Sequence, residues 1–564
     1  MPRRVNMRVI GGHAVGKQSF TRGAVILATA SIVSRFLGVA YIVALPRIIR
    51  DEGMGLLQMV RPVYNLAVIL SVAGLPVALS KLVAEQLAVD NTRGAIRVFR
   101  WTLFSMMVLG ALFTGGLGLG AKWLSVNIIR DPLSYLALLV MVPSVFTLAV
   151  DAALRGFFQG MQYMTPSAVS QVVEQVCRVV TMLALATVLM PQGVEYGAAG
   201  ASAGSVMGAL GGLVVLVWYY VVWRRRIGDA LPRRGESERA ESGIRILQRL
   251  FSLSLPIVLG AVLWPTMQMI DTGLVPLRMQ MAGYSADAIR EALGYFGMAL
   301  SLMHFPNVIT WALSVTLVPA VAEASALRAY HQLQRRVAEG LRITVLFGLP
   351  ASVGLLLLSR EAAHLLFGYP QAGDPLRILA LGTLAVGLFQ VCSGILQGLG
   401  LVFLPVRNLV VGVTVKCCLN YWLTALPGMG IKGAAWGTVL GFGIASLLNV
   451  VAVCRRTGVR PNWRELVLKP GLASLVMGLS VVVIYDALYG TVTWLLQKAT
   501  WSWGQIHSEF VCNGCATIGA VFAGLIVYTI GLLGTGALYQ RDIEMLPKIG
   551  VKLGRWLSSH GWVK

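Results

Sequence analysis

Residues 197–223 read GAAGASAGSVMGALGGLVVLVWYYVVW, and an arginine triplet follows them at 224–226. No charged residue interrupts this stretch. A helix rises about 1.5 Å per residue, so the stretch is long enough to cross a hydrocarbon core of about 30 Å. Its first half is rich in glycine, alanine and serine, which allow membrane helices to pack closely. The stretch therefore predicts a membrane-spanning helix with a close helical neighbour.

Apolar runs of similar length recur along the whole chain. Of its 564 residues, 56% are hydrophobic and 13% are charged, whereas soluble proteins carry roughly a quarter charged residues. We predict an all-α integral membrane protein with about fourteen transmembrane helices. The predicted spans are 23–46, 54–80, 101–120, 132–150, 163–189, 197–223, 250–275, 292–322, 342–358, 378–397, 408–425, 433–453, 470–486 and 513–538.

Basic residues are distributed unevenly between the predicted loops. Most of the 47 Lys and Arg residues fall in alternate loops and in both tails. Arg155 is counted here with the loop after the fourth span. Because cytoplasmic loops are enriched in Lys and Arg, both termini are predicted to be cytoplasmic and the protein to lie in the cytoplasmic membrane. Anionic lipids also attract such loops, which explains the net charge of +23 without a nucleic-acid partner.

The sequence contains an internal repeat. Residues 70–76 match 313–319 with an offset of 243, 156–160 match 394–398 with an offset of 238, and 200–208 match 433–441 with an offset of 233. Matches in the same order with a slowly changing offset indicate a duplication. Each copy holds an even number of spans, so the copies have the same orientation and are related by an axis along the membrane normal.

The repeat predicts two pseudo-symmetric lobes of six helices. The N-lobe covers 23–223 and the C-lobe 250–457, with a cytoplasmic arginine-rich linker at 224–249 between them. Two further helices lie within 458–540, and cytoplasmic basic tails cover 1–22 and 541–564. Paired lobes are typical of alternating-access transporters.

An enzyme would need a different set of residues. Acid clusters, a phosphate-binding loop and a nucleophile–base pair are not evident in the sequence. Cys512 and Cys515 have CxxC spacing, but no second CxxC pair or histidine cluster accompanies them. We therefore predict a transporter that is not an enzyme and that has no cofactor.

Four basic side chains fall inside predicted spans: Arg35, Arg61, Arg178 and Lys416. A charge at the bilayer centre costs about 2.5–3.5 kcal/mol on insertion scales, so such residues usually face a polar cavity or a partner. Arg178 and Lys416 are related by an offset of 238, which places a cation on the fifth helix of each lobe. Since guanidinium and ammonium groups bind phosphate well, we predict that these cations bind an anionic substrate.

The sequence leaves alternatives open for these charged residues. Glu174 precedes Arg178 by four residues, which allows an internal ion pair on one helix face. Arg61 lies near a span end and could instead extend to the lipid head groups. Asp271 could bind Na⁺ or H⁺, pair with a cavity cation, or serve in packing. His304 is predicted to be a hydrogen-bonded core residue.

Several segments resemble the stage V sporulation protein B family over nearly the whole chain. They are RGAVIL at 22–27, SRFLG at 34–38, DEGMGLLQM at 51–59, AGLPVALSKLVAE at 73–85 and RGFFQGMQYMTPSAVSQ at 155–171. The resemblance implies the MATE-like fold of the multidrug/oligosaccharidyl-lipid/polysaccharide (MOP) exporter superfamily, with a cationic central cavity. It also implies a groove at the last two helices for a polyprenyl tail, and it aligns Arg35 with a basic position of lipid II flippases.

This resemblance implies a flippase for an undecaprenyl-pyrophosphate-linked cell-wall precursor, lipid II or a similar one, in peptidoglycan or spore-cortex synthesis. The partners would be this polyprenyl-linked anionic glycolipid, the lipid bilayer and proteins of cell-wall synthesis. Transport could be coupled to the membrane potential, to Na⁺ or to H⁺. The alternatives are an exporter of another lipid-linked polysaccharide unit and a cation-coupled multidrug exporter of the same fold.

Overall fold

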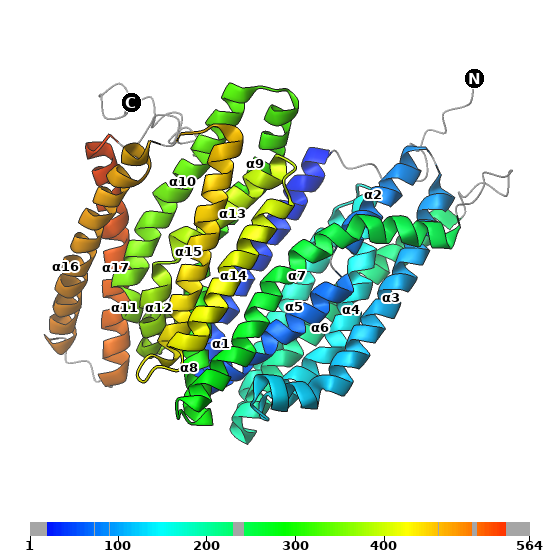
Figure 1. Cartoon of the computed structure of the whole chain (residues 1–564). Coiled ribbons are helices and arrows are strands. Elements are labelled where there is room, and N and C mark those ends of the chain that lie inside the picture. The colour runs from blue at the N-terminus through cyan, green and yellow to red at the C-terminus, as the bar shows by residue number, and fades with distance from the viewer. Residues whose placement is uncertain are drawn as a thin grey trace. The chain divides into compact units, whose positions relative to one another are not determined.

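The computed structural model describes residues 20–72, 74–89, 91–228, 242–460, 462–498 and 505–536. In these ranges every regular element is a helix (Figure 1). The chain divides into two compact units, which we call unit 1 (residues 1–273) and unit 2 (residues 274–564). Half of the arginine-rich linker predicted at 224–249, residues 229–241, lies outside the described residues, and the predicted lobe boundaries stay a prediction.

Unit 1 is built from long helices. They are α1 (Phe20–Val72), α2 (Leu75–Ala88), α3 (Thr92–Trp123), α4 (Ser134–Gly160), α5 (Thr165–Leu189), α6 (Val194–Gly228) and most of α7 (Gly243–Met281), with the short helices η1 (Leu124–Ile129) and η2 (Met190–Gln192).

Unit 2 mixes long and short helices. They are α8 (Ala286–His304), α9 (Asn307–Ala326), α10 (Tyr330–Leu357), α11 (Ser359–Phe367), η3 (Pro370–Ala372), α12 (Gly373–Ala380), α13 (Thr383–Gly398), α14 (Phe403–Leu423), α15 (Gly430–Thr457), η4 (Arg464–Leu468), α16 (Lys469–Lys498) and α17 (Gln505–Gly534).

Within the described ranges, 11 helices are long and apolar enough to cross a membrane, or 12 if one bent pair counts as a single span. This confirms a multi-pass, all-α membrane protein, while the count of fourteen stays a prediction. Part of the difference is that the predicted spans 23–46 and 54–80 fall in one apolar stretch, Thr29–Ala88, and that α7 is not among the eleven.

The chain breaks inside α1 and directly after it. Arg50 has φ 59° and ψ −176°, which ends one helical segment and starts the next between the first two predicted spans. Gly74, with φ 77°, then separates α1 from α2. A Cβ atom on Gly74 would also lie only 2.7 Å from the carbonyl oxygen of Ser254. Glycine is therefore required here for both its backbone conformation and its lack of a side chain.

Two spans that the sequence predicts as continuous are broken, so their predicted continuity is wrong. The span at 292–322 is divided at Phe305 and Pro306 into α8 and α9, since proline has no N–H to continue the helix. The span at 378–397 is bent by 51° between α12 and α13. There the amide of Gly382 donates to the carbonyl of Leu379, a tighter turn than in an α-helix.

An aromatic cluster forms the core of unit 1. Phe99, Phe157 and Phe158 are almost completely buried. The ring centroids of Phe99 and Phe157 are 4.4 Å apart, and those of Phe157 and Trp223 are 5.1 Å apart in an edge-on arrangement. These contacts hold α3, α4 and α6 together through buried ring area and favourable ring geometry.

Close glycine contacts hold α4 against α2 in unit 1. A Cβ atom on Gly156 would lie 2.8 Å from the carbonyl oxygen of Pro76, and one on Gly160 would lie 2.8 Å from that of Ser80. These contacts leave no room for a side chain, so the two helix backbones touch along this face.

The same contacts recur in unit 2 between α13 and α9. A Cβ atom on Gly394 would lie 2.7 Å from the carbonyl oxygen of Ser314, and one on Gly398 would lie 2.7 Å from that of Val318. Both members of each contact are shifted by 238 relative to unit 1. The repeat is therefore present in the packing. The predicted match of 70–76 to 313–319 is wrong in register, because Pro76 corresponds to Ser314.

Candidate functional site

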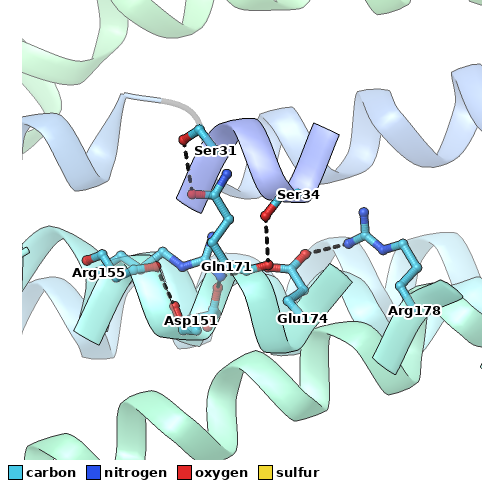
Figure 2. Close-up of polar contacts among 9 residues, drawn as sticks. Ser31, Ser34, Asp151, Arg155, Gln171, Glu174 and Arg178 are labelled. Carbon is cyan, nitrogen blue, oxygen red and sulfur yellow. Dashed lines mark hydrogen bonds and ion pairs between the residues drawn. The ribbon is translucent and has the colours of Figure 1, made fainter. Parts of the chain in front are cut away.

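An ion pair lies in the middle of α5 (Figure 2). The guanidinium of Arg178 donates to one carboxylate oxygen of Glu174, one helical turn earlier. The side chain of Glu174 is 11% exposed and that of Arg178 is 27% exposed. Of the alternatives that the sequence left open for Arg178, the structure shows the internal pair.

A second acid–base pair on α4 joins this one. Arg155 contacts Asp151 with 2.8 Å between Nη2 and Oδ2, and it donates to Glu174 with 2.6 Å between Nη2 and Oε2. Glu174 therefore lies between two guanidinium groups from two helices, as Figure 2 shows. We call these four residues, Asp151, Arg155, Glu174 and Arg178, the charge network of unit 1.

The sequence reasoning missed half of this network. The prediction that Arg155 belongs to a loop is wrong, because Arg155 lies within α4, and the sequence alone indicates no role for Asp151. Asp151 is one of the most buried charged residues, with its side chain 2% exposed. The available signal was the spacing: Asp151 and Arg155 are four residues apart in the same order as Glu174 and Arg178.

The network is compact but not fully hydrogen-bonded. Among the described residues, buried Oδ1 of Asp151, Nε of Arg155 and Nε of Arg178 have no hydrogen-bond partner. Two guanidinium and two carboxylate groups compensate each other in charge, yet their desolvation is costly. Ionisable groups at such depth are usually retained for function.

Gln171 on α5 contacts α1. Ser31 donates to the side-chain oxygen of Gln171 at 3.3 Å, and Ser34 approaches the carbonyl oxygen of Gln171 at 3.4 Å (Figure 2). Arg35 follows Ser34 on α1, but its side chain lies outside the described residues. The predicted substrate contact of Arg35 therefore stays a prediction.

Arg61 differs from the arginines of the charge network. It lies on α1 and is half-buried. Within the described part of the chain it makes no hydrogen bond and no ion pair. One turn later, the hydroxyl of Tyr64 accepts a hydrogen bond from Ser144 at 2.8 Å, which fixes this face of α1 against α4. The guanidinium of Arg61 is thus held inside a spanning segment with its donors unused.

Lys416 on α14 occupies the position in unit 2 that Arg178 occupies in unit 1. A Cβ atom on Gly208 would lie 2.8 Å from Cβ of Arg178, and one on Gly441 would lie 2.9 Å from Cβ of Lys416. The same glycine contact thus holds both residues against the next helix, which supports the predicted equivalence. Lys416 is 4% exposed.

The acids of the charge network have no counterparts in unit 2. The offset of 238 relates Asp151 to Phe389 and Glu174 to Gly412. Gly412 is also required by packing, since a Cβ atom there would lie 2.5 Å from the carbonyl oxygen of Gly441. The basic position of the repeat is therefore kept while both acidic positions are lost.

A neutral network takes the place of the ion pairs. Ser393, which corresponds to Arg155, accepts a hydrogen bond from Asn449 at 3.2 Å. Asn449 in turn accepts one from Asn408 at 2.8 Å. These uncharged side chains join α13, α14 and α15, and the exposed Arg407 donates to the side-chain oxygen of Asn408 at 3.3 Å. Unit 2 thus fixes its helices with amides where unit 1 uses carboxylates and guanidiniums.

The remaining predicted residues lie apart from these networks. His304 ends α8, is half-buried, and lies within reach of the charge of Lys416. Asp271 on α7 is half-buried and takes part in an interaction with its surroundings. Its proposed exchange of Na⁺ or H⁺ stays a prediction. Cys512 and Cys515 are free thiols, and the described residues contain no cluster of three or more His, Cys, Asp or Glu suited to a metal.

Known proteins and family models match nearly the whole chain. Residues 20–325 match the family model described as polysaccharide biosynthesis protein, and residues 256–422 match the MatE model. The chain is 31% identical over 537 residues to stage V sporulation protein B of Bacillus subtilis (strain 168), covering 95% of this chain and 99% of that protein. It is 28% identical over 547 residues to lipid II flippase MurJ of the same strain, covering 91% and 95%.

The fold agrees with these matches. A solved structure of lipid II flippase MurJ in an inward closed conformation superimposes with a TM-score of 0.61 at 14% identity, covering 90% of this chain and 98% of that one. The relatives are transporters and flippases, so this chain is a membrane transporter or flippase and not an enzyme. With a relative at this identity along nearly its full length, the chain belongs to the stage V sporulation protein B family of the MOP exporter superfamily.

Proposed function

We propose that this protein translocates an undecaprenyl-pyrophosphate-linked cell-wall precursor, lipid II or a similar glycolipid, by alternating access across the cytoplasmic membrane. One observation carries the proposal: Arg61 is half-buried in a spanning helix, and its guanidinium has no hydrogen bond or ion pair among the described residues. A charge at that depth is tolerable beside water or an anion. A diphosphate offers the paired oxygens that a guanidinium binds best.

Lys416 supports the same proposal from unit 2. Its ammonium group is buried in α14, at the position that corresponds to Arg178, where the repeat has replaced both acids by Phe389 and Gly412. We assign to Arg61, Lys416 and Arg35 the binding of the substrate phosphates. Arg178 would join them only if it left Glu174, so we give it a secondary role.

The relatives narrow the substrate class. One of them is named as a lipid II flippase, and a family model described as polysaccharide biosynthesis protein covers residues 20–325. Cytoplasmic termini would let the protein accept a precursor that is made in the cytoplasm. Coupling to the membrane potential, or to Na⁺ or H⁺ at Asp271, is part of this proposal.

Two other cargoes compete with lipid II. Another lipid-linked polysaccharide unit would bind through the same phosphates and would differ only in its sugars. A cation-coupled multidrug exporter is favoured by the MatE match at residues 256–422. Cationic drugs would, however, be repelled by Arg61 and Lys416, whereas acidic residues would attract them.

Reconstitution in liposomes tests the proposal. The purified protein is supplied with lipid II, with an undecaprenyl-pyrophosphate carrying a different glycan, or with a cationic dye, and movement to the other leaflet is measured. We expect lipid II to move and the dye to stay. Arg61→Ala and Lys416→Ala should each slow translocation by at least about tenfold, because the loss of a buried hydrogen bond to a charged group costs about 1.5–3 kcal/mol.

Exposed basic residues provide matched controls. Arg97→Ala in unit 1 and Lys432→Ala in unit 2 remove one positive charge each from the surface and should keep wild-type rates. Transport of the dye without any glycolipid would favour the drug exporter. Full glycolipid transport by Arg61→Ala and Lys416→Ala would overturn the assignment of the binding residues.

A further inference from the structure

The end of α15 is hydrogen-bonded to the start of α10. Gly458, with φ 70°, ends α15, and its amide donates to the carbonyl of Cys454. The side-chain amide of Gln334, from the first turns of α10, donates to the carbonyl oxygen of Thr457 at 3.1 Å. Figure 1 shows the start of α10 and the end of α15 at the same end of unit 2. Two basic segments that are far apart in the sequence are therefore brought together.

This end of unit 2 is strongly basic. The residues that we call the basic end are Arg328, Arg335, Arg336, Arg455, Arg456, Arg460 and Arg464, and all are exposed. Arg335 is paired with Glu339 at 2.8 Å. Glu323, near the end of α9, and Glu465 are two further exposed acids in the same region. Several positive charges therefore remain uncompensated by carboxylates of this surface.

Large apolar side chains are exposed among these arginines. Trp463 is 59% exposed and Tyr330 is 67% exposed, and Leu468 on η4 is 56% exposed. Directly afterwards α16 begins, with Leu472 and Leu475 exposed as expected for a helix that faces lipid. The basic end is thus located where the chain enters the apolar region of the membrane. Tryptophan and tyrosine prefer this level, and arginines there contact lipid phosphates.

We propose that the basic end, with Trp463 and Tyr330, is a binding surface for anionic phospholipid head groups. Arginine side chains would bind the lipid phosphates, and the two rings would lie at the level of the glycerol backbone. Charge complementarity and the position next to α16 favour a bilayer lipid over a soluble acidic protein, since a soluble partner would leave the exposed Trp463 and Leu468 uncovered. This inference does not depend on the identity of the translocated substrate.

Reconstitution with defined lipids tests this surface. The full-length protein is placed in nanodiscs of phosphatidylcholine with or without phosphatidylglycerol, and the lipids retained after gentle release are counted by native mass spectrometry. For Arg455→Gln/Arg456→Gln we expect the affinity for phosphatidylglycerol to fall by about fivefold for each charge removed. Arg455→Lys/Arg456→Lys should retain most of the binding, because it keeps the charge.

A matched double variant removes the same charge from the other end of unit 2. Arg377→Gln/Lys432→Gln changes two exposed basic residues and should leave phosphatidylglycerol retention at the wild-type level. Brominated phosphatidylglycerol should quench the fluorescence of wild type more than that of Trp463→Phe. Equal retention in the Arg455/Arg456 and Arg377/Lys432 variants would overturn the proposal. So would equally tight binding of soluble polyglutamate to the protein in pure phosphatidylcholine.

Discussion

At the scale of single residues, Glu174 holds the charge network together, because it is the acid that contacts both guanidinium groups. Arg155 and Arg178 come from different helices, and their side chains are only 24% and 27% exposed. Removing the carboxylate would leave two partly buried cations facing each other. Arg178 would then pay its desolvation cost without compensation, and Arg155 would keep only Asp151 as its acidic partner.

Glu174→Gln should therefore destabilise the protein by about 3–5 kcal/mol, the range for breaking a buried ion pair by removing one partner. Thermal unfolding in detergent, followed by helical circular dichroism, measures the change. Glu174→Gln/Arg178→Gln should recover part of the loss, because it removes one of the two facing cations. As the control, Glu339→Gln breaks a pair with Arg335, whose side chain is 57% exposed, and should change stability by less than about 1 kcal/mol. Equal losses in Glu174→Gln and Glu339→Gln would contradict a buried network.

Sequence reasoning reached only part of this network. The spacing of Glu174 and Arg178 predicted their pair, because neighbours on one helix follow from the helical period alone. The bridge from Arg155 to Glu174 depends on how α4 and α5 pack, which no local pattern reports. Arg155 also lies near the end of a hydrophobic run. A count of charges per loop therefore treats it as a loop residue, although it lies within α4.

At the scale of helices, the glycines of α6 and α15 decide which helix faces pack. A Cβ atom on Gly204 would lie 2.6 Å from the carbonyl oxygen of Arg178, so α5 and α6 touch through their backbones. In unit 2, a Cβ atom on Gly437 would clash with the side-chain oxygen of Asn420. The small-residue spacing was visible in the sequence and correctly predicted close packing. The break at Arg50 falls between the first two predicted spans, whereas the bend at Gly382 falls inside the predicted span 378–397 and was missed.

Gly204→Ala should destabilise unit 1, because the added methyl group meets backbone that can move only if the helices separate. We expect a loss of about 1–3 kcal/mol, as for other overpacked sites. Gly116→Ala on α3 is the matched control, since no atom lies within 4 Å of the added Cβ. It should be neutral or stabilising by about 0.5–1 kcal/mol, from the higher helix propensity of alanine. Thermal unfolding of both variants measures the change in stability. Equal stability of Gly204→Ala and Gly116→Ala would contradict the close contact of α5 and α6.

At the scale of the whole chain, the contacts within each unit agree with the predicted alternation of loops. In unit 1, Arg249 pairs with Glu85 at 2.9 Å, which joins two loops predicted to be cytoplasmic. On the other predicted side, Arg47 and Arg50 of α1 line a pocket of about 680 Å³ together with Thr187 and residues 190–194. In unit 2, Gln334 bonds to Thr457 at one end, and Tyr284 lies against Gly430 at the other. If one span between two of these loops were missing or added in the prediction, the two loops would be predicted on opposite sides of the membrane. The contacts between them would then be impossible.

Labelling from the two sides of the membrane can therefore test the orientation. In a background without the native cysteines, Arg97→Cys and Arg336→Cys should be protected from an impermeant maleimide in intact cells and should react after permeabilisation. Lys432→Cys and Arg377→Cys should react in intact cells, because the sequence predicts both residues on the opposite side of the membrane, and all four positions are exposed in the structure. The reverse pattern would show that the protein has the opposite orientation in the membrane. Its basic end would then face the outer leaflet, and the proposed uptake of a cytoplasmic precursor would be contradicted. In unit 2, labelling of Arg336→Cys and Lys432→Cys from the same side would contradict the alternation itself. The contacts within unit 2 place these two residues at opposite ends of its helices.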